Sequence, residues 1–130
     1  MSSWTHVAGV IRVNDIRTND YTPRDWDKEI GRECLFEDPE ELWDEAEVTP
    51  DDFLPMGSEG TLQKSIWENP DKACMAAYTI TIFGDLRDHY DPQSIVDWFK
   101  EKCSKLAVRQ ACITVYSGSN GTVNWVYDND

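Results

Sequence analysis

The chain has 130 residues and a net charge of −13, and 40% of its residues are hydrophobic, including six tryptophans. The aromatic content excludes a disordered chain, and the negative charge excludes binding to long nucleic acids or to an anionic membrane surface. We expect a single domain over residues 1–130. No apolar run approaches the roughly 18 residues of a membrane-spanning helix, and the N-terminus lacks the pattern of a secretion signal, so we expect a cytoplasmic protein.

The first half of the chain predicts one strand and two helices. Polar and apolar side chains alternate over Trp4–Val13, which is typical of a strand. A short helix is expected from Thr22-Pro23, with Thr22 as its cap and Asp25 in its first turn. Asp38-Pro39-Glu40-Glu41 is a second helix start.

The second half predicts four strands and the clearest helix. Thr61–Trp67 and Ala73–Phe83 are expected to pair as an antiparallel hairpin. Asp91–Leu106 carries one apolar stripe and begins with Asp91-Pro92, so it predicts a helix capped by Asp91. Val108–Tyr116 and Thr122–Tyr127 are the last two strands.

This order of elements predicts an α+β fold. It contains the βαββαβ pattern of ferredoxin-like proteins, followed by an extra C-terminal strand. We therefore expect a mainly antiparallel sheet with helices covering one face. The other face would be open or paired with a second copy, which predicts a homo-oligomer. That face is expected to carry some of Trp4, His6, Thr79, Thr81 and Trp125.

The four cysteines are far apart and form no C-x-x-C pair. Cys103 and Cys112 fall in apolar surroundings, so we expect buried, reduced thiols. A zinc site is not predicted because the ligand spacing is missing, and no cofactor is predicted.

Two loops are candidates for a ligand site. The alternation of the longest strand stops at Gly84, so Asp85–Asp91 is expected to be a charged loop leading into the helix. Strand-to-helix loops often hold ligands. The acids of this loop and His89 could hold Mg²⁺ or Mn²⁺, but their spacing matches no metal motif, so no metal site is predicted. The glycine loop Gly57–Gly60 has N–H groups that can bind an anion. We expect the two loops to lie side by side and leave a recess.

The aromatic residues suit stacking against a flat base, and arginines suit a phosphate. We predict a ligand site in which Arg87 holds a phosphate, Trp4 stacks, and Ser58 and His89 donate hydrogen bonds. The arginines that could hold a phosphate are Arg12, Arg17, Arg87 and Arg109.

Catalytic signatures are missing: the chain has no G-x-S-x-G, no P-loop and no G-x-G-x-x-G. A binding protein is therefore favoured over an enzyme, although a nucleotide-cleaving enzyme using His89 and Asp88 as acid and base stays open. Nine acids and no base lie between Glu37 and Asp52. This segment allows another alternative, an inhibitor that imitates DNA and binds a basic host nuclease or effector through Asp44, Glu45 and Glu47.

Several segments together resemble a group of small proteins encoded by phages and prophages of gut bacteria: WTHVAGVIR (Trp4–Arg12), LPMGSEG (Leu54–Gly60), IWENPDK (Ile66–Lys72), AAYTITIFGDLRD (Ala76–Asp88) and VRQACIT (Val108–Thr114). The resemblance skips the acidic middle and brings no catalytic residues. It implies a viral gene product acting in the bacterial cytoplasm. The hypothesis that follows is an anti-defence protein that binds and sequesters a small nucleotide-derived immune signal, with a virion component as a further alternative.

Overall fold

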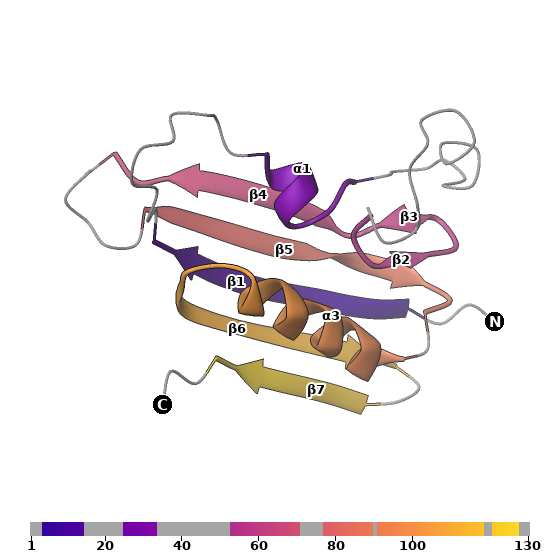
Figure 1. The fold of residues 1–130 in the computed structure, drawn as a ribbon. Coiled ribbons are helices and arrows are strands. Elements are labelled where there is room, and N and C mark those ends of the chain that lie inside the picture. Colours follow the sequence, from indigo (N-terminus) through magenta and orange to yellow (C-terminus); the bar gives the residue numbers. More distant parts are fainter. Residues whose placement is uncertain are drawn as a thin grey trace.

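The computed structural model describes residues 4–14, 25–33, 53–70, 77–89, 91–118 and 121–127. These residues form an α+β structure (Figure 1). Its elements are β1 (Trp4–Val13), α1 (Trp26–Glu29), β2 (Met56–Gly57), β3 (Gly60–Thr61), β4 (Gln63–Glu68), β5 (Tyr78–Arg87), α3 (Pro92–Ser104), β6 (Val108–Ser117) and β7 (Gly121–Val126).

The main sheet has five strands in the order β4-β5-β1-β6-β7, and every neighbouring pair is antiparallel. The predicted antiparallel hairpin is confirmed as β4 and β5. The glycine loop was predicted to lack regular structure, but it holds the small hairpin β2–β3, in which Gly57 pairs with Gly60. The predicted strand Thr61–Trp67 is accordingly divided, with Thr61 in β3 and Gln63 opening β4.

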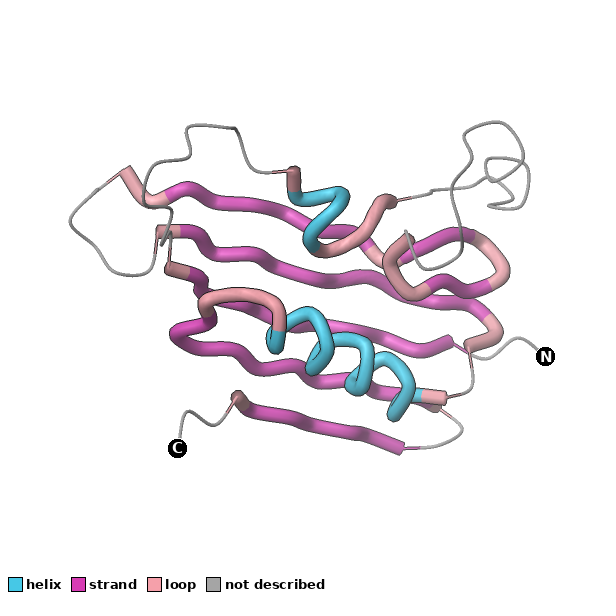
Figure 2. The backbone as a smooth tube through the Cα atoms, in the orientation of Figure 1, coloured by secondary structure: helices cyan, strands magenta, loops and turns pink. Residues whose placement is uncertain are grey.

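One face of the main sheet forms the core and the other is open. In β1 the odd-numbered residues are buried, including Val7, Ile11 and Val13, as the alternation predicts. The two described helices lie on this buried side (Figure 2). The other side, which we call the open face, carries the even-numbered residues of β1, β6 and β7 and the odd-numbered residues of β4 and β5.

Helix α3 has the start that the sequence predicts. The side chain of Asp91 accepts a hydrogen bond from the Ser94 N–H at 3.2 Å, and Pro92 follows it. This satisfies a backbone donor that would otherwise lack a partner at the helix start. The helix buries Ile95, Val96, Phe99 and Cys103 against the sheet.

Helix α1 begins later than predicted. Asp25 has an extended backbone and its side chain accepts from the Lys28 N–H, so Asp25 is the N-cap and is not a first-turn residue. The predicted start, Thr22-Pro23, lies outside the described residues. So do the predicted helix start at Asp38 and the whole acidic segment, including Asp44, Glu45 and Glu47.

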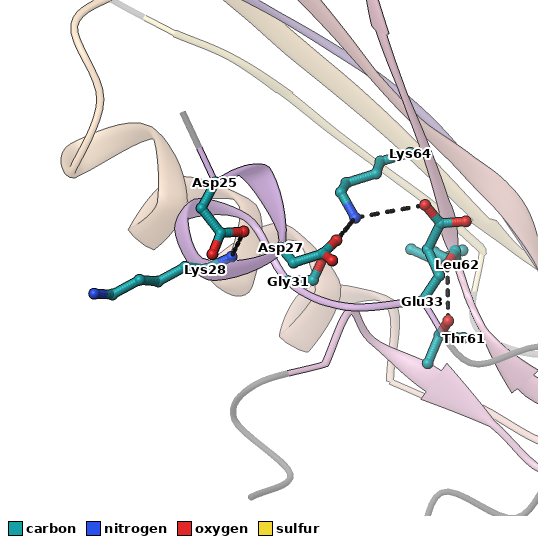
Figure 3. Close-up of polar contacts among 8 residues, drawn as sticks. All are labelled: Asp25, Asp27, Lys28, Gly31, Glu33, Thr61, Leu62 and Lys64. Atoms are coloured by element: carbon teal, nitrogen blue, oxygen red, sulfur yellow. Dashed lines mark hydrogen bonds and ion pairs between the residues drawn. The ribbon is translucent and has the colours of Figure 1, made fainter. Parts of the chain in front are cut away.

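A buried lysine ties α1 to the sheet. Lys64 lies in β4 on the side of the helices, and its side chain is only 7% exposed. Its Nζ donates to the Asp27 carboxylate at 2.6 Å and to the Gly31 carbonyl at 2.9 Å, and it lies 3.5 Å from the Glu33 carboxylate (Figure 3). Burying an ammonium group costs free energy unless it is paired and hydrogen-bonded, and these contacts meet that requirement for Lys64.

The predicted end of the longest strand is wrong. Strand β5 continues through Gly84 to Arg87, and its pairing with β1 runs to the pair Trp4 and Arg87. Gly84 has a φ of 141°, which few other residues adopt, and the alternation resumes after it with buried Leu86. Asp85 is therefore a strand residue, and only the short stretch after Arg87 connects β5 to α3.

Of the five residues of which some were expected on the open face, Trp4, His6, Thr79 and Thr81 lie there and Trp125 does not, and the placement of Cys112 differs from expectation. Trp125 lies on the helix side, edge-on to Phe99 with ring centroids 5.8 Å apart, and so it is absent from the open face. Cys103 is buried as predicted, but Cys112 is exposed because it pairs with Val10 and shares the open face with it. Cys34 and Cys74 lie outside the described residues.

No helix in the described part of the chain is both long and apolar enough to cross a membrane.

Candidate functional site

The four residues predicted to bind a ligand come together at one end of the sheet, which we call the corner site (Trp4, Ser58, Arg87 and His89). Trp4 pairs with Arg87 across β1 and β5. The Ser58 N–H donates to the Arg87 carbonyl at 2.9 Å, so the β2–β3 hairpin lies against the end of β5 (Figure 1). The hydroxyl of buried Thr5 donates to the His89 carbonyl at 2.6 Å. The expected proximity of the two loops is therefore confirmed.

The side chains of Arg87 and Ser58 already have polar partners. The Arg87 Nη1 donates to the Glu59 carboxylate at 2.6 Å, and its Nε lies 3.8 Å from the Asp88 carboxylate. The Ser58 hydroxyl donates to Asp88 at 3.1 Å. Across the β1–β5 pair, the His6 Nδ1 and the Asp85 Oδ1 are 2.5 Å apart.

Carboxylates therefore outnumber guanidinium groups at this corner. Glu59 and Asp88 lie beside the single arginine, Asp85 lies two residues before it in β5, and a phosphate placed there would meet like charges. The corner site stays a prediction, but its local charge is unfavourable for the phosphate contact expected of Arg87.

His89 of the corner site borders a large hollow. The hollow measures about 730 Å³ and lies between α3 and the segment before β2, with Leu54 and Trp98 in its wall. Burial lowers the pKa of His89 below its usual 6.5, and the Asp91 carboxylate opposes this shift only in part. The imidazole is thus neutral at pH 7, and its Nδ1 accepts the Asp91 N–H at 3.4 Å. Trp4, Ser58 and Arg87 do not line this hollow.

A second hollow, of about 510 Å³, lies at the opposite end of β1. We call it the arginine hollow. Its polar lining consists of Arg12, Arg109 and Gln110, and its apolar lining of Val10, Ala111 and Val126, with Cys112 and Tyr127 completing the wall.

The arginine hollow depends on an irregularity in the pairing of β1 with β6. The register shifts between Arg12 and Val13, and as a result the consecutive residues Arg109 and Gln110 are both exposed. The Arg12 Nη1 donates to the Gln110 side-chain oxygen at 3.1 Å. Neither Arg12 nor Arg109 forms an ion pair with a carboxylate of the described residues.

The sequence identified both arginines as possible phosphate contacts, but it did not place them together. That placement needs the strand register and the bulge, which alternation alone does not fix. Groups of three or more residues able to hold a metal ion are absent from the described part of the chain.

No family model matches the chain, and comparisons with curated proteins and with solved structures found no similar protein.

Proposed function

We propose that this chain binds a small anionic ligand of the nucleotide type and does not transform it. The observation that carries the proposal is the pair of guanidinium groups, Arg12 and Arg109, at a mainly apolar hollow. The proposal moves the ligand from the corner site to the arginine hollow.

Charge supports this location. The whole chain carries −13, so a site for an anion needs a local excess of positive charge. Arg12 and Arg109 supply two positive charges that are not neutralised by ion pairs with described carboxylates. Planar guanidinium groups form paired hydrogen bonds with phosphate oxygens, and they keep their charge at every physiological pH.

Size and lining also support it. A hollow of about 510 Å³ lies within the range of small-molecule pockets. Val10, Ala111 and Val126 offer an apolar surface for a base, and the Gln110 amide can donate to a ring or sugar oxygen. The phosphate end and the base end of a nucleotide would thus meet different parts of the lining.

The lining favours binding over chemistry. It contains no histidine, aspartate or glutamate to act as a general acid or base. Its nucleophiles are the Cys112 thiol and the Tyr127 hydroxyl, and the lining holds no basic imidazole or carboxylate to activate them.

The resemblance to phage proteins suggests the biological setting. A phage protein that binds a nucleotide without turnover would sequester a host immune signal in the bacterial cytoplasm. We propose this anti-defence role as the context of the binding site.

The test is a thermal-shift and calorimetric titration of the full chain with cyclic dinucleotides, ADP-ribose derivatives and pyrophosphate. Arg12→Gln and Arg109→Gln should each weaken binding about tenfold or more, because each removes a charge-assisted contact. Arg32→Gln is the matched control, since Arg32 is exposed and outside the hollow.

Arg87→Gln decides between the two locations. Loss of binding in this variant alone would return the ligand to the corner site and remove the arginine hollow from the proposal. Absence of binding by every probe would reject a nucleotide-binding function.

Three alternatives from the sequence stay as predictions. Nucleotide cleavage by His89 and Asp88 would show as product formation in the same titrations, lost in His89→Ala. Inhibition of a basic partner through Asp44, Glu45 and Glu47 would depend strongly on salt. A virion role would require the chain to be found in purified particles.

For the fold, we propose the ferredoxin-like arrangement with an added strand. The strand order supports it. Helix α1 lies between β1 and β4 in the chain, and β5 lies between these two strands in the sheet. Helix α3 connects β5 to β6, and β1 lies between these two strands in the sheet. Two interleaved units of this kind are the split βαβ pattern, and β7 adds an edge strand.

A further inference from the structure

We infer that the open face of the sheet is the surface through which two copies of this chain associate. The inference concerns assembly and does not depend on the proposed ligand. It is built on the distribution of apolar side chains and charges over this face.

The large exposed hydrophobic residues gather on the open face. In the described chain they number five, namely Trp4 (40% exposed), Trp67 (52%), Phe83 (37%), Tyr116 (50%) and Val126 (70%). The strand register puts every one of them on the open face, with at least one on each strand of the sheet. Exposed apolar side chains scattered over a whole surface are ordinary, but five that share one face of a sheet favour an interaction surface.

The centre of this face is uncharged. Ala8, an exposed residue of the middle strand β1, lies between Phe83 on β5 and Thr114 on β6. Small and apolar side chains at the centre allow a second sheet to approach to the roughly 10 Å spacing of packed sheets.

Charge selects a second copy as the occupant. The chain has 25 acidic residues, yet Asp85 is the one carboxylate on the open face within the described strands, and it is paired with His6. A basic partner would find almost no carboxylates there, and a nucleic acid would be repelled by the rest of the chain. Two copies of this face can meet without bringing their acidic surfaces into contact.

The area is adequate for a stable dimer. Five strands spaced about 4.8 Å apart, each 6 to 10 residues long with a rise of about 3.3 Å, give a projected face of roughly 670 Å². The accessible surface of a face with large side chains exceeds its projection, which brings it near the ~800 Å² per partner of specific interfaces.

Association would also change the arginine hollow. Several residues that line the hollow belong to the open face, namely Val10, Arg12, Gln110, Cys112 and Val126. A second copy seated on this face would therefore cover the hollow or narrow its entrance.

The test is sedimentation equilibrium of the full chain without ligand, over a wide range of protein concentration. Wild type should show a monomer–dimer equilibrium. Ala8→Glu should raise the dimer dissociation constant at least about tenfold, because the dimer would bury a carboxylate at the centre of the interface. Tyr116→Ser, which removes an exposed ring without adding charge, should weaken the dimer less.

Gln93→Glu is the control, since it adds the same single charge at an exposed position of α3. It should leave the equilibrium unchanged, and far-UV circular dichroism checks that every variant is folded. Alkylation of Cys112 provides a second measurement, because it should slow as the wild-type protein is concentrated. A wild type that is monomeric at every concentration overturns the inference, as does a folded Ala8→Glu variant that dimerises as wild type does.

Discussion

The backbone of Gly57 lies directly against the backbone of Arg87. A Cβ atom on residue 57 would stand 2.8 Å from the Arg87 amide nitrogen and closer still to its carbonyl oxygen. These residues are 30 positions apart, and the hydrogen bond from the Ser58 N–H to the Arg87 carbonyl depends on this approach. The contact holds the β2–β3 hairpin at the end of β5.

Gly57→Ala should therefore destabilise the protein. The added methyl group meets backbone atoms, which cannot rotate away as a side chain would, so we expect a loss of about 1–3 kcal/mol in the free energy of unfolding. Urea denaturation measures it. Gly118→Ala is the matched control because a Cβ there meets nothing within 4 Å, and it should change stability by less than about 0.5 kcal/mol. Equal effects of the two substitutions would contradict the contact.

Alternation and capping predicted most of the fold. Strand β1 has the predicted bounds, and α3 begins at the predicted cap, Asp91. Both signals are local, since a strand with one buried face and the start of a helix can each be recognised from residues that are close in the sequence. The end of β5 was missed because Gly84 has no side chain to continue the alternation, although the pairing with β1 does continue.

The candidate site was less predictable because its charges are set by distant residues. The proximity of Ser58 and Arg87 was expected, but the ion pair of Arg87 with Glu59 was not. Arg12 and Arg109 become neighbours only through the register shift in the β1–β6 pair. Partners of this kind depend on which residues face each other across strands, and composition contains no such information.

Lys64 should contribute more to stability than an exposed lysine. Replacing it with methionine keeps the length of the side chain but leaves the Gly31 carbonyl without this donor, and we expect a loss of about 1–3 kcal/mol. Lys105→Met is the control. Lys105 pairs with Glu101 at 3.1 Å, but both side chains are 61% exposed, so no measurable change is expected. Denaturation curves of the two variants check the difference, and a neutral Lys64→Met would show that the tether is not stabilising.

The two described cysteines should differ in reactivity. Burial raises the pKa of the Cys103 thiol to about 12, so almost no thiolate forms there near neutral pH. Cys112 is exposed and accessible to a reagent. Iodoacetamide at low protein concentration should therefore modify Cys112 in the folded protein and reach Cys103 only after unfolding. Peptide mass mapping separates these sites from Cys34 and Cys74, and early modification of Cys103 would contradict its burial.

His89 should make the protein less stable in mild acid. Burial lowers its pKa in the folded state below the usual 6.5, so the unfolded chain binds a proton more readily than the folded chain does. The stabilising contribution is complete above pH 6.5 and is lost as the pH falls through the lowered pKa. The free energy of unfolding should consequently fall on acidification more steeply in wild type than in His89→Gln.

Proton NMR measures the shift directly. The chain has two histidines, and the His6→Gln variant identifies the His89 ring signal. Its titration midpoint should lie below 6.5 in the folded protein and return toward that value in urea. A folded-state midpoint at or above 6.5 would mean that the imidazole is more solvated, or closer to carboxylates, than its position beside α3 allows.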